Sequence, residues 1–196
     1  MPRTSVPPTH MTRATTTSFP GFDAPAAGFE APLEMLSACH GRVERQCRTL
    51  LRMVPHLLDH GPDQAAREAA QSVMRYFDTS APQHHADEEE DLFPALLRHA
   101  PDAELSGLGE LIATLDAQHR TLERAWRDLR VKLEGVCSGT TRSLDADEVA
   151  YLVNLYRSHI EREESELLPL AARVLDTAQL DAIGRAMRLR RGIKEI

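Results

Sequence analysis

Two stretches of the chain, HHADEEEDLFP at residues 84–94 and SHIEREESELLP at residues 158–169, repeat one pattern of charged residues. In each, a His is followed four residues later by Glu-Glu and ten residues later by Pro, in the frame H-x-x-x-E-E-x-x-L-[FL]-P. Side chains four residues apart lie one above the other on a helix, so such a His and Glu can bind one metal ion together or contribute to two adjacent ions. A single pair is typical of a surface ion pair, whereas the repeated frame predicts a metal site.

Two more histidines indicate that each motif has a partner helix. His40 precedes His84 by 44 residues, and His119 precedes His159 by 40 residues. We interpret the chain as two copies of a helix pair, in which the first helix supplies a His and the second supplies a His and a Glu. This duplication predicts a bundle with approximate two-fold symmetry and a dinuclear site on its axis.

The rest of the chain has the periodicity of helices. Apolar residues recur at helical spacing from Leu33 to Met187, with breaks near Gly61 and Pro101, and no segment alternates with a period of two. Aromatic residues make up only 5% of the chain, which favours helices over a β-sandwich. We therefore predict an all-α fold, namely an antiparallel up-down four-helix bundle with a short extra C-terminal helix after Asp176.

Prolines are expected to disturb two of these helices. A Pro inside a helix lacks an N–H group, and its ring clashes with the carbonyl group four residues earlier. We expect Pro55 to end or kink the first helix, and residues 79–82 (TSAP) to interrupt the second.

The 196 residues fit one domain with two short tails. Residues 1–29 are rich in Thr, Pro and Ala and have neither helical nor strand periodicity, so we expect a disordered N-terminal tail. Residues 30–190 form the predicted domain. Residues 191–196 form a short basic tail, which we expect to be solvated.

Composition excludes several classes of function. The net charge of −7 disfavours sequence-independent nucleic-acid binding, because an acidic surface repels phosphate. No apolar run approaches 18 residues, so we expect no membrane-spanning helix. The three cysteines form no C-x-x-C motif and cannot all pair, which favours a reducing, cytoplasmic location. The sequence does not indicate a protein partner.

The two motifs resemble the signature stretches of hemerythrin-like, or HHE cation-binding, domains, and the likeness covers about residues 30–190. This resemblance implies a four-helix bundle that holds two non-haem iron ions (Fe2+/Fe3+). It also implies His ligands, two carboxylates that bridge the metals, and room for an oxo or hydroxo bridge. By motif position, the implied metal ligands are His40, His84, Glu88, His119, His159 and Glu163.

The chain departs from the oxygen-carrying hemerythrins, which have two histidines four residues apart on the third helix. Here the third helix has His119, and its neighbours at that spacing are Leu115, which cannot bind a metal, and Glu123, which could. The last His–carboxylate spacing is four residues with Glu, where hemerythrins have five with Asp. We therefore expect a more carboxylate-rich site with an open position for water, peroxide or a gas.

Three residues are further candidate ligands: Glu123, Glu44 and His85. His85 follows His84 but turns about 100° away along the helix, so we expect it to support the site from behind or to be exposed. A ferritin-like di-iron site is excluded because it needs Glu three residues before a ligand His. The residues at those positions are Ser37, Ala81, Asp116 and Tyr156.

Three classes of function fit these features. The first is a cytosolic di-iron protein that senses, scavenges or handles O2, NO, peroxide or iron. The second is an enzyme built on the same site, with peroxidase or catalase-like activity. The third is a regulatory module with zinc or a single iron. The open position favours an exchangeable small ligand over a closed structural site.

Overall fold

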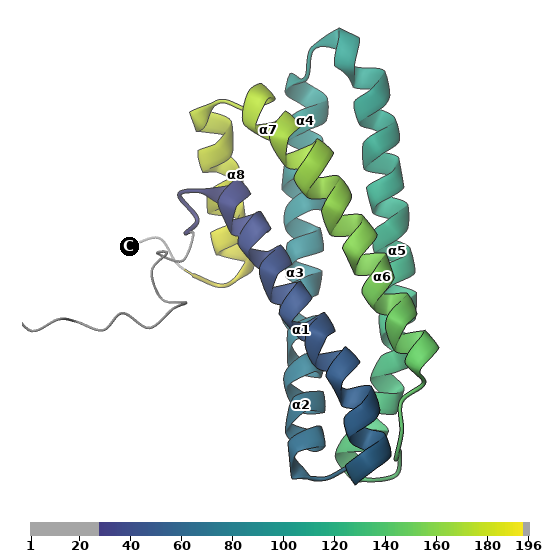
Figure 1. The fold of residues 1–196 in the computed structure, drawn as a ribbon. Helices are drawn as coiled ribbons and strands as arrows, with labels where there is room; N and C mark the ends of the chain where they lie inside the picture. Colours follow the sequence, from purple (N-terminus) through teal and green to yellow (C-terminus); the bar gives the residue numbers. More distant parts are fainter. Residues whose placement is uncertain (1–27, 194–196) are drawn as a thin grey trace, which may run out of the picture.

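The computed structural model describes residues 28–193, and within that range the chain is helical, with no strands (Figure 1). The predicted all-α fold is therefore confirmed. The expected disorder of the N-terminal tail falls almost wholly on residues 1–27, outside the described residues. The α-helices are α1 (Pro32–His60), α2 (Gln64–Arg75), α3 (Ala81–Ala86), α4 (Phe93–His99), α5 (Asp102–Ser138), α6 (Ala146–Arg162), α7 (Leu168–Val174) and α8 (Thr177–Arg190).

Three short π-helical segments join some of these helices end to end: η1 (Tyr76–Ser80), η2 (Asp87–Leu92) and η3 (Glu163–Leu167). The segments from α2 to α4 follow one another without a loop, and so do α6, η3 and α7. In the bundle, α1 packs against α2 and α6, and α5 also packs against α2 and α6. None of the described helices is long and apolar enough to cross a membrane.

Two apolar clusters form the core. One contains Leu50, Phe77 and Leu129, and the other contains Leu36 and Leu115. Along α1, a His lies between the two clusters at position 40, and along α5 another His does so at position 119. The core is therefore divided by a polar layer at the level of the repeated motifs.

Each π-helical segment ends two residues before a proline: Pro82, Pro94 or Pro169. The backbone N–H of Phe93 donates to the carbonyl oxygen of Glu88, and that of Leu168 donates to Glu163. These bonds span five residues instead of four, so the turn is widened where the proline would otherwise clash with a carbonyl group. The expected interruption at residues 79–82 is thus a widened turn, and the helical path continues through it.

The expectation that Pro55 ends the first helix is wrong, because α1 continues through it to His60. The carbonyl group that loses its helical partner is that of Leu51, and the Leu51 side chain is 41% exposed. Residues 51 and 55 both lie at exposed positions of the helix, where a missing hydrogen bond costs less than it would in the core.

We predict that Pro55→Ala stabilises the protein, because Ala restores the N–H group at an exposed helical position. The gain in the free energy of unfolding should be up to about 3 kcal/mol, the difference in helix propensity between Pro and Ala. Urea unfolding would measure it. Leu58→Ala, a change at a position 70% exposed in the same helix, should alter stability by less than about 0.5 kcal/mol. An unchanged or reduced stability of Pro55→Ala would contradict the prediction.

Candidate metal centre

The polar layer consists of buried ionisable side chains. Each is at most 7% exposed, although charged groups are seldom buried unless they are paired or bind a metal. The residues are His40, His84, His85, Asp87, Glu88, His119, His159 and Glu163. All six ligands implied by motif position are therefore in the interior, brought there by α1, α3, η2, α5, α6 and η3.

One half of the cluster brings together His40, His84, Glu88 and Glu163, whose ligand atoms all lie within 4.8 Å of one another. The Nε2 atoms of His40 and His84 are 3.2 Å apart. Glu163 Oε2 lies 3.0 Å from Nε2 of His40, and Glu88 Oε1 lies 3.4 Å from Nε2 of His84. This half is therefore built from two imidazoles and one oxygen of each carboxylate.

The other half brings the same two carboxylates together with His119 and His159, again within 4.8 Å. The Nε2 atoms of these two histidines are 3.1 Å apart. Glu88 Oε2 lies 3.3 Å from Nε2 of His119, and Glu163 Oε1 lies 2.9 Å from Nε2 of His159. Each carboxylate thus presents one oxygen to each histidine pair, which is the arrangement of a group that bridges two metal ions.

The arrangement of the donor atoms suits bound metal ions better than it suits hydrogen bonds among the side chains. Both carboxylate oxygens of Glu88 and of Glu163 are buried without a well-formed hydrogen bond. Two nitrogen ligands about 2.1 Å from one metal at a right angle are about 3 Å apart, which is close to the separation within each histidine pair. Imidazole nitrogen and carboxylate oxygen together suit first-row transition metals.

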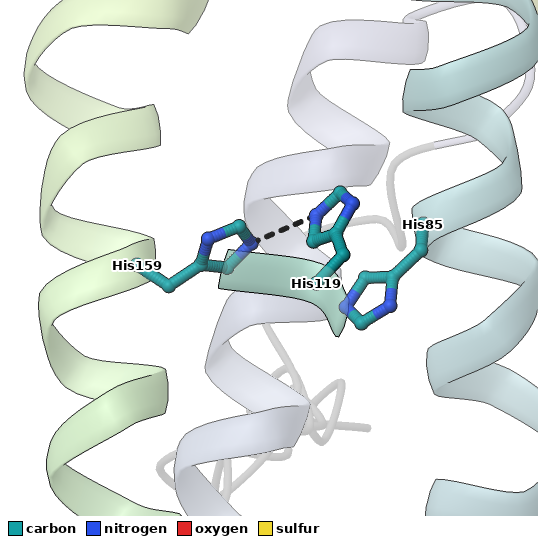
Figure 2. Close-up of side chains that lie close together, drawn as sticks. All are labelled: His85, His119 and His159. Atoms are coloured by element: carbon teal, nitrogen blue, oxygen red, sulfur yellow. Dashed lines mark hydrogen bonds between the residues drawn. The ribbon is translucent and has the colours of Figure 1, made fainter. Parts of the chain in front are cut away.

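His85 adds a third imidazole to the second half of the cluster. Its ligand nitrogen lies within 4.8 Å of those of His119 and His159, and its ring stacks on that of His119 with centroids 3.9 Å apart (Figure 2). Of the two alternatives expected for His85, support of the site from behind or exposure to solvent, exposure is wrong because the residue is buried. Two successive positions of α3 face the interior, with His84 directed toward α1 and His85 toward α5. In the second motif the equivalent position is the apolar Ile160.

The second Glu of each motif has a role that the sequence analysis missed. Glu164 Oε1 lies 2.6 Å from Nδ1 of His40, and Glu89 Oε1 lies 2.7 Å from Nδ1 of His119. An Nδ1–H that donates to a carboxylate leaves Nε2 free to bind a metal and fixes the orientation of the ring. Repetition of Glu-Glu, rather than of a single Glu, was the available signal in the sequence.

Glu44 and Glu123 lie outside the cluster. Glu123 is 48% exposed and pairs with Arg120, and Glu44 is 57% exposed and pairs with Arg48. In α1 and α5 the buried side of the helix continues at the third residue after the His, Val43 or Leu122. The fourth residue, Glu44 or Glu123, therefore points toward solvent.

Electrostatics of the cluster favour protons on two imidazoles. Burial alone would lower the pKa of His40, but its bonds to Glu163 and Glu164 raise it to about 9. Burial opposes protonation of His119 as well, yet Glu163 and Glu88 raise its pKa to about 10. A metal ion must displace these protons in order to bind Nε2.

The pKa values of the other ionisable residues in the cluster are also shifted, two downward by burial and two by burial together with neighbouring charges. Burial lowers the pKa of His84 to about 3, and it holds that of His85 well below the ordinary range. Burial and the neighbouring charge of Glu163 raise the pKa of Glu88 to about 8. Burial also opposes ionisation of Glu163, but its close contacts with the imidazoles of His119 and His159 outweigh burial and hold its pKa well below the ordinary range.

Comparison with known proteins agrees with this geometry. The model of the hemerythrin HHE cation-binding domain family matches residues 31–171, and the chain belongs to this family. It is also similar to an uncharacterized protein of Haemophilus influenzae, with 36% identity over 169 residues that cover 86% of this chain and 95% of the relative. Family membership and the buried His/Glu cluster together support binding of metal cations.

We predict that metal binding releases protons and strengthens as the pH rises. His40 and His119, with pKa values of about 9 and about 10, are protonated at neutral pH and must lose a proton to bind a metal. Titration with Fe2+ in a weakly buffered solution at about pH 7 should therefore acidify it by more than one proton per chain. Affinity should fall between about pH 8 and about pH 6. Binding without proton release would contradict the raised pKa values of His40 and His119.

A second prediction concerns the supporting carboxylates. Glu164→Ala and Glu89→Ala should each weaken metal affinity by about 10–100-fold, because the ring that each one orients becomes free to turn. Glu166→Ala is a matched control, since Glu166 lies in the same π-helical segment as Glu164 but pairs with Arg162 at a position 53% exposed. Competition with a coloured chelator would measure the affinities. If Glu164→Ala and Glu166→Ala had equal affinities, the supporting role would be disproved.

Proposed function

We propose that the protein is a di-iron protein in which His40, His84, Glu88, His119, His159 and Glu163 hold two non-haem iron ions. The observation that carries the proposal is the placement of Glu88 and Glu163, each with one oxygen toward either histidine pair. A site for a single ion would not need two histidine pairs on opposite sides of the same carboxylates. The proposal includes the antiparallel up-down arrangement of four long helical rods expected from the sequence.

His85 is included as a further ligand on the side of His119 and His159, and to bind the same ion its ring must turn out of the stack with His119. That side then offers three imidazoles, while the side of His40 and His84 offers two. The side with fewer protein ligands supplies the open position for a small exchangeable ligand, which we propose to be O2, NO or peroxide. Glu44 and Glu123 have no part in the proposed site because both pair with arginines at the surface.

Iron is proposed over zinc because of the chemistry of the donors. Structural zinc sites are usually tetrahedral and closed, with four ligands for one ion. Here two carboxylates are shared between two groups of imidazoles, and an oxygen- and nitrogen-rich site with an open position suits iron that changes its oxidation state. A cytoplasmic location remains part of the proposal and is supported by the cysteines Cys39, Cys47 and Cys137, which are all unpaired.

The proposal predicts about two irons per chain after anaerobic purification from iron-replete cells. Glu88→Ala or Glu163→Ala should abolish the dinuclear site because each change removes a ligand from both ions. Glu44→Ala and Glu123→Ala are matched controls that should keep full iron content. Elemental analysis would measure this. One tightly bound zinc without iron, or equal iron in Glu163→Ala and Glu123→Ala, would refute the proposal.

The same preparation distinguishes a gas or peroxide protein from a redox-inert module. Visible spectra should change when O2, NO or peroxide is added to the reduced protein, because a ligand that enters the open position alters the electronic state of iron. Turnover of peroxide, measured by its rate of disappearance, would support the enzymatic alternative. No spectral change with any of the three would indicate a closed site.

A further inference from the structure

Helix α8 lies beyond residues 31–171, the part of the chain that the family model matches, but it contacts the segment that carries Glu88. It packs against α1 and η2 (Figure 1). Arg191, directly after it, belongs to the basic tail (residues 191–196) that was expected to be solvated. Instead, the side chains of Arg190 and Arg191 are only 18% and 15% exposed and point toward η2.

The target of these arginines is Asp87, the residue directly before Glu88. Its side chain is fully buried. Arg191 binds it with both ends of its guanidinium group, with Nη1 3.0 Å from Oδ1 and Nη2 2.6 Å from Oδ2. Arg190 also donates to Oδ1 of Asp87, and its other nitrogen lies 2.7 Å from Oδ2 of Asp91. Two cations therefore compensate the buried carboxylate and fasten η2 to α8.

Helix α8 is itself held against the start of the bundle. The ring of Phe29 lies under Arg188 and Arg191, with distances of 5.4 and 5.8 Å from the ring centroid to the guanidinium carbons. Arg188 also pairs with Glu30 at 3.0 Å. The backbone of Phe29 approaches Gly184 so closely that a Cβ atom there would be 2.0 Å from the Phe29 carbonyl oxygen. These contacts place Arg191 between Phe29 and Asp87.

Among residues 28–193, the second motif has no equivalent fastening. Its residue in the place of Asp87 is Arg162, whose side chain is 39% exposed and pairs with Glu166 on the same helical path. In the described part of the chain, the clamp formed by Arg190, Arg191 and Asp87 therefore acts on the segment that presents Glu88 and not on the one that presents Glu163.

We propose that α8 is a latch for the metal centre: Arg190 and Arg191 hold Asp87, and through it η2, so that Glu88 stays in contact with both histidine pairs. Without the arginines, Asp87 is a buried charge with no compensation, and it must move toward water. Because Glu88 is the next residue, the same movement withdraws it from the centre. Opening of the latch then speeds the exchange of metal, a consequence that rests on the proposed function, whereas the fastening of η2 does not.

The latch can be tested with Arg191→Met and with the double variant Arg190→Met/Arg191→Met. Matched controls are Arg185→Met, at an exposed position of the same helix, and Arg162→Met, at the equivalent place of the second motif. The first measurement is amide hydrogen exchange of residues 87–93 in metal-free protein. We expect exchange at least about tenfold faster in the double variant and unchanged in both controls, with residues 163–168 unaffected throughout. If the double variant does not fold, the same measurement is made on Arg191→Met, which should also exchange faster than the controls.

The second measurement is the rate at which iron passes from loaded protein to an external chelator. It should rise by about tenfold or more in Arg191→Met and stay at the parent rate in Arg185→Met. Adding Asp87→Asn to the double variant removes the uncompensated charge, so both rates should fall back toward those of the parent.

The two measurements separate this inference from the proposed function. If the parent protein binds no iron, the proposed function fails, and hydrogen exchange still decides whether α8 fastens η2. If the parent binds iron but Arg191→Met and Arg185→Met exchange amides and release iron equally, the latch is refuted. Failure of Asp87→Asn to slow either rate would refute the role assigned to the buried charge.

Discussion

The central constraint on this structure is the burial of two carboxylates, Glu88 and Glu163, in the middle of a helical bundle. Neither side chain is exposed, and none of their four oxygens has a well-formed hydrogen bond. Such groups are costly in an apolar interior unless positive charge surrounds them. Four imidazoles point their Nε2 atoms at these oxygens, and the apolar clusters lie on either side. The helices are arranged so that a bound cation can supply the positive charge and the contacts that the carboxylate oxygens lack.

Much of this was predictable because it depends on short-range periodicity. Helical spacing and the repeated motif predicted the helical fold. They also identified the six residues that the structure brings together in one cluster. What the sequence did not predict depends on neighbours distant along the chain. His85 became part of the cluster because α5 lies against that side of α3, and spacing along one helix carries no such information. The same reasoning applies to Glu164 and Glu89, whose partners are on other helices.

The prolines remove backbone hydrogen bonds as expected, but they do not end the helices that contain them. A missing N–H group was expected to break helices, but in three places the backbone widens by one residue and continues. Two of these widened segments begin at or just before Glu88 and Glu163. The bulky side chains Phe93 and Leu168, next to the prolines, are then buried in the adjacent apolar cluster. The repeated proline thus belongs to the same structural unit as the repeated carboxylate.

The place of His85 is taken in the second motif by Ile160, so the two halves of the duplicated bundle are not chemically equal. One side of the central carboxylates faces three imidazoles and the other faces two. Metal affinity rises with the number of well-placed donors, so the two positions should fill in order. If the site holds two ions, as proposed, a half-loaded molecule would be a single species with its ion beside His119 and His159, and not a mixture of two.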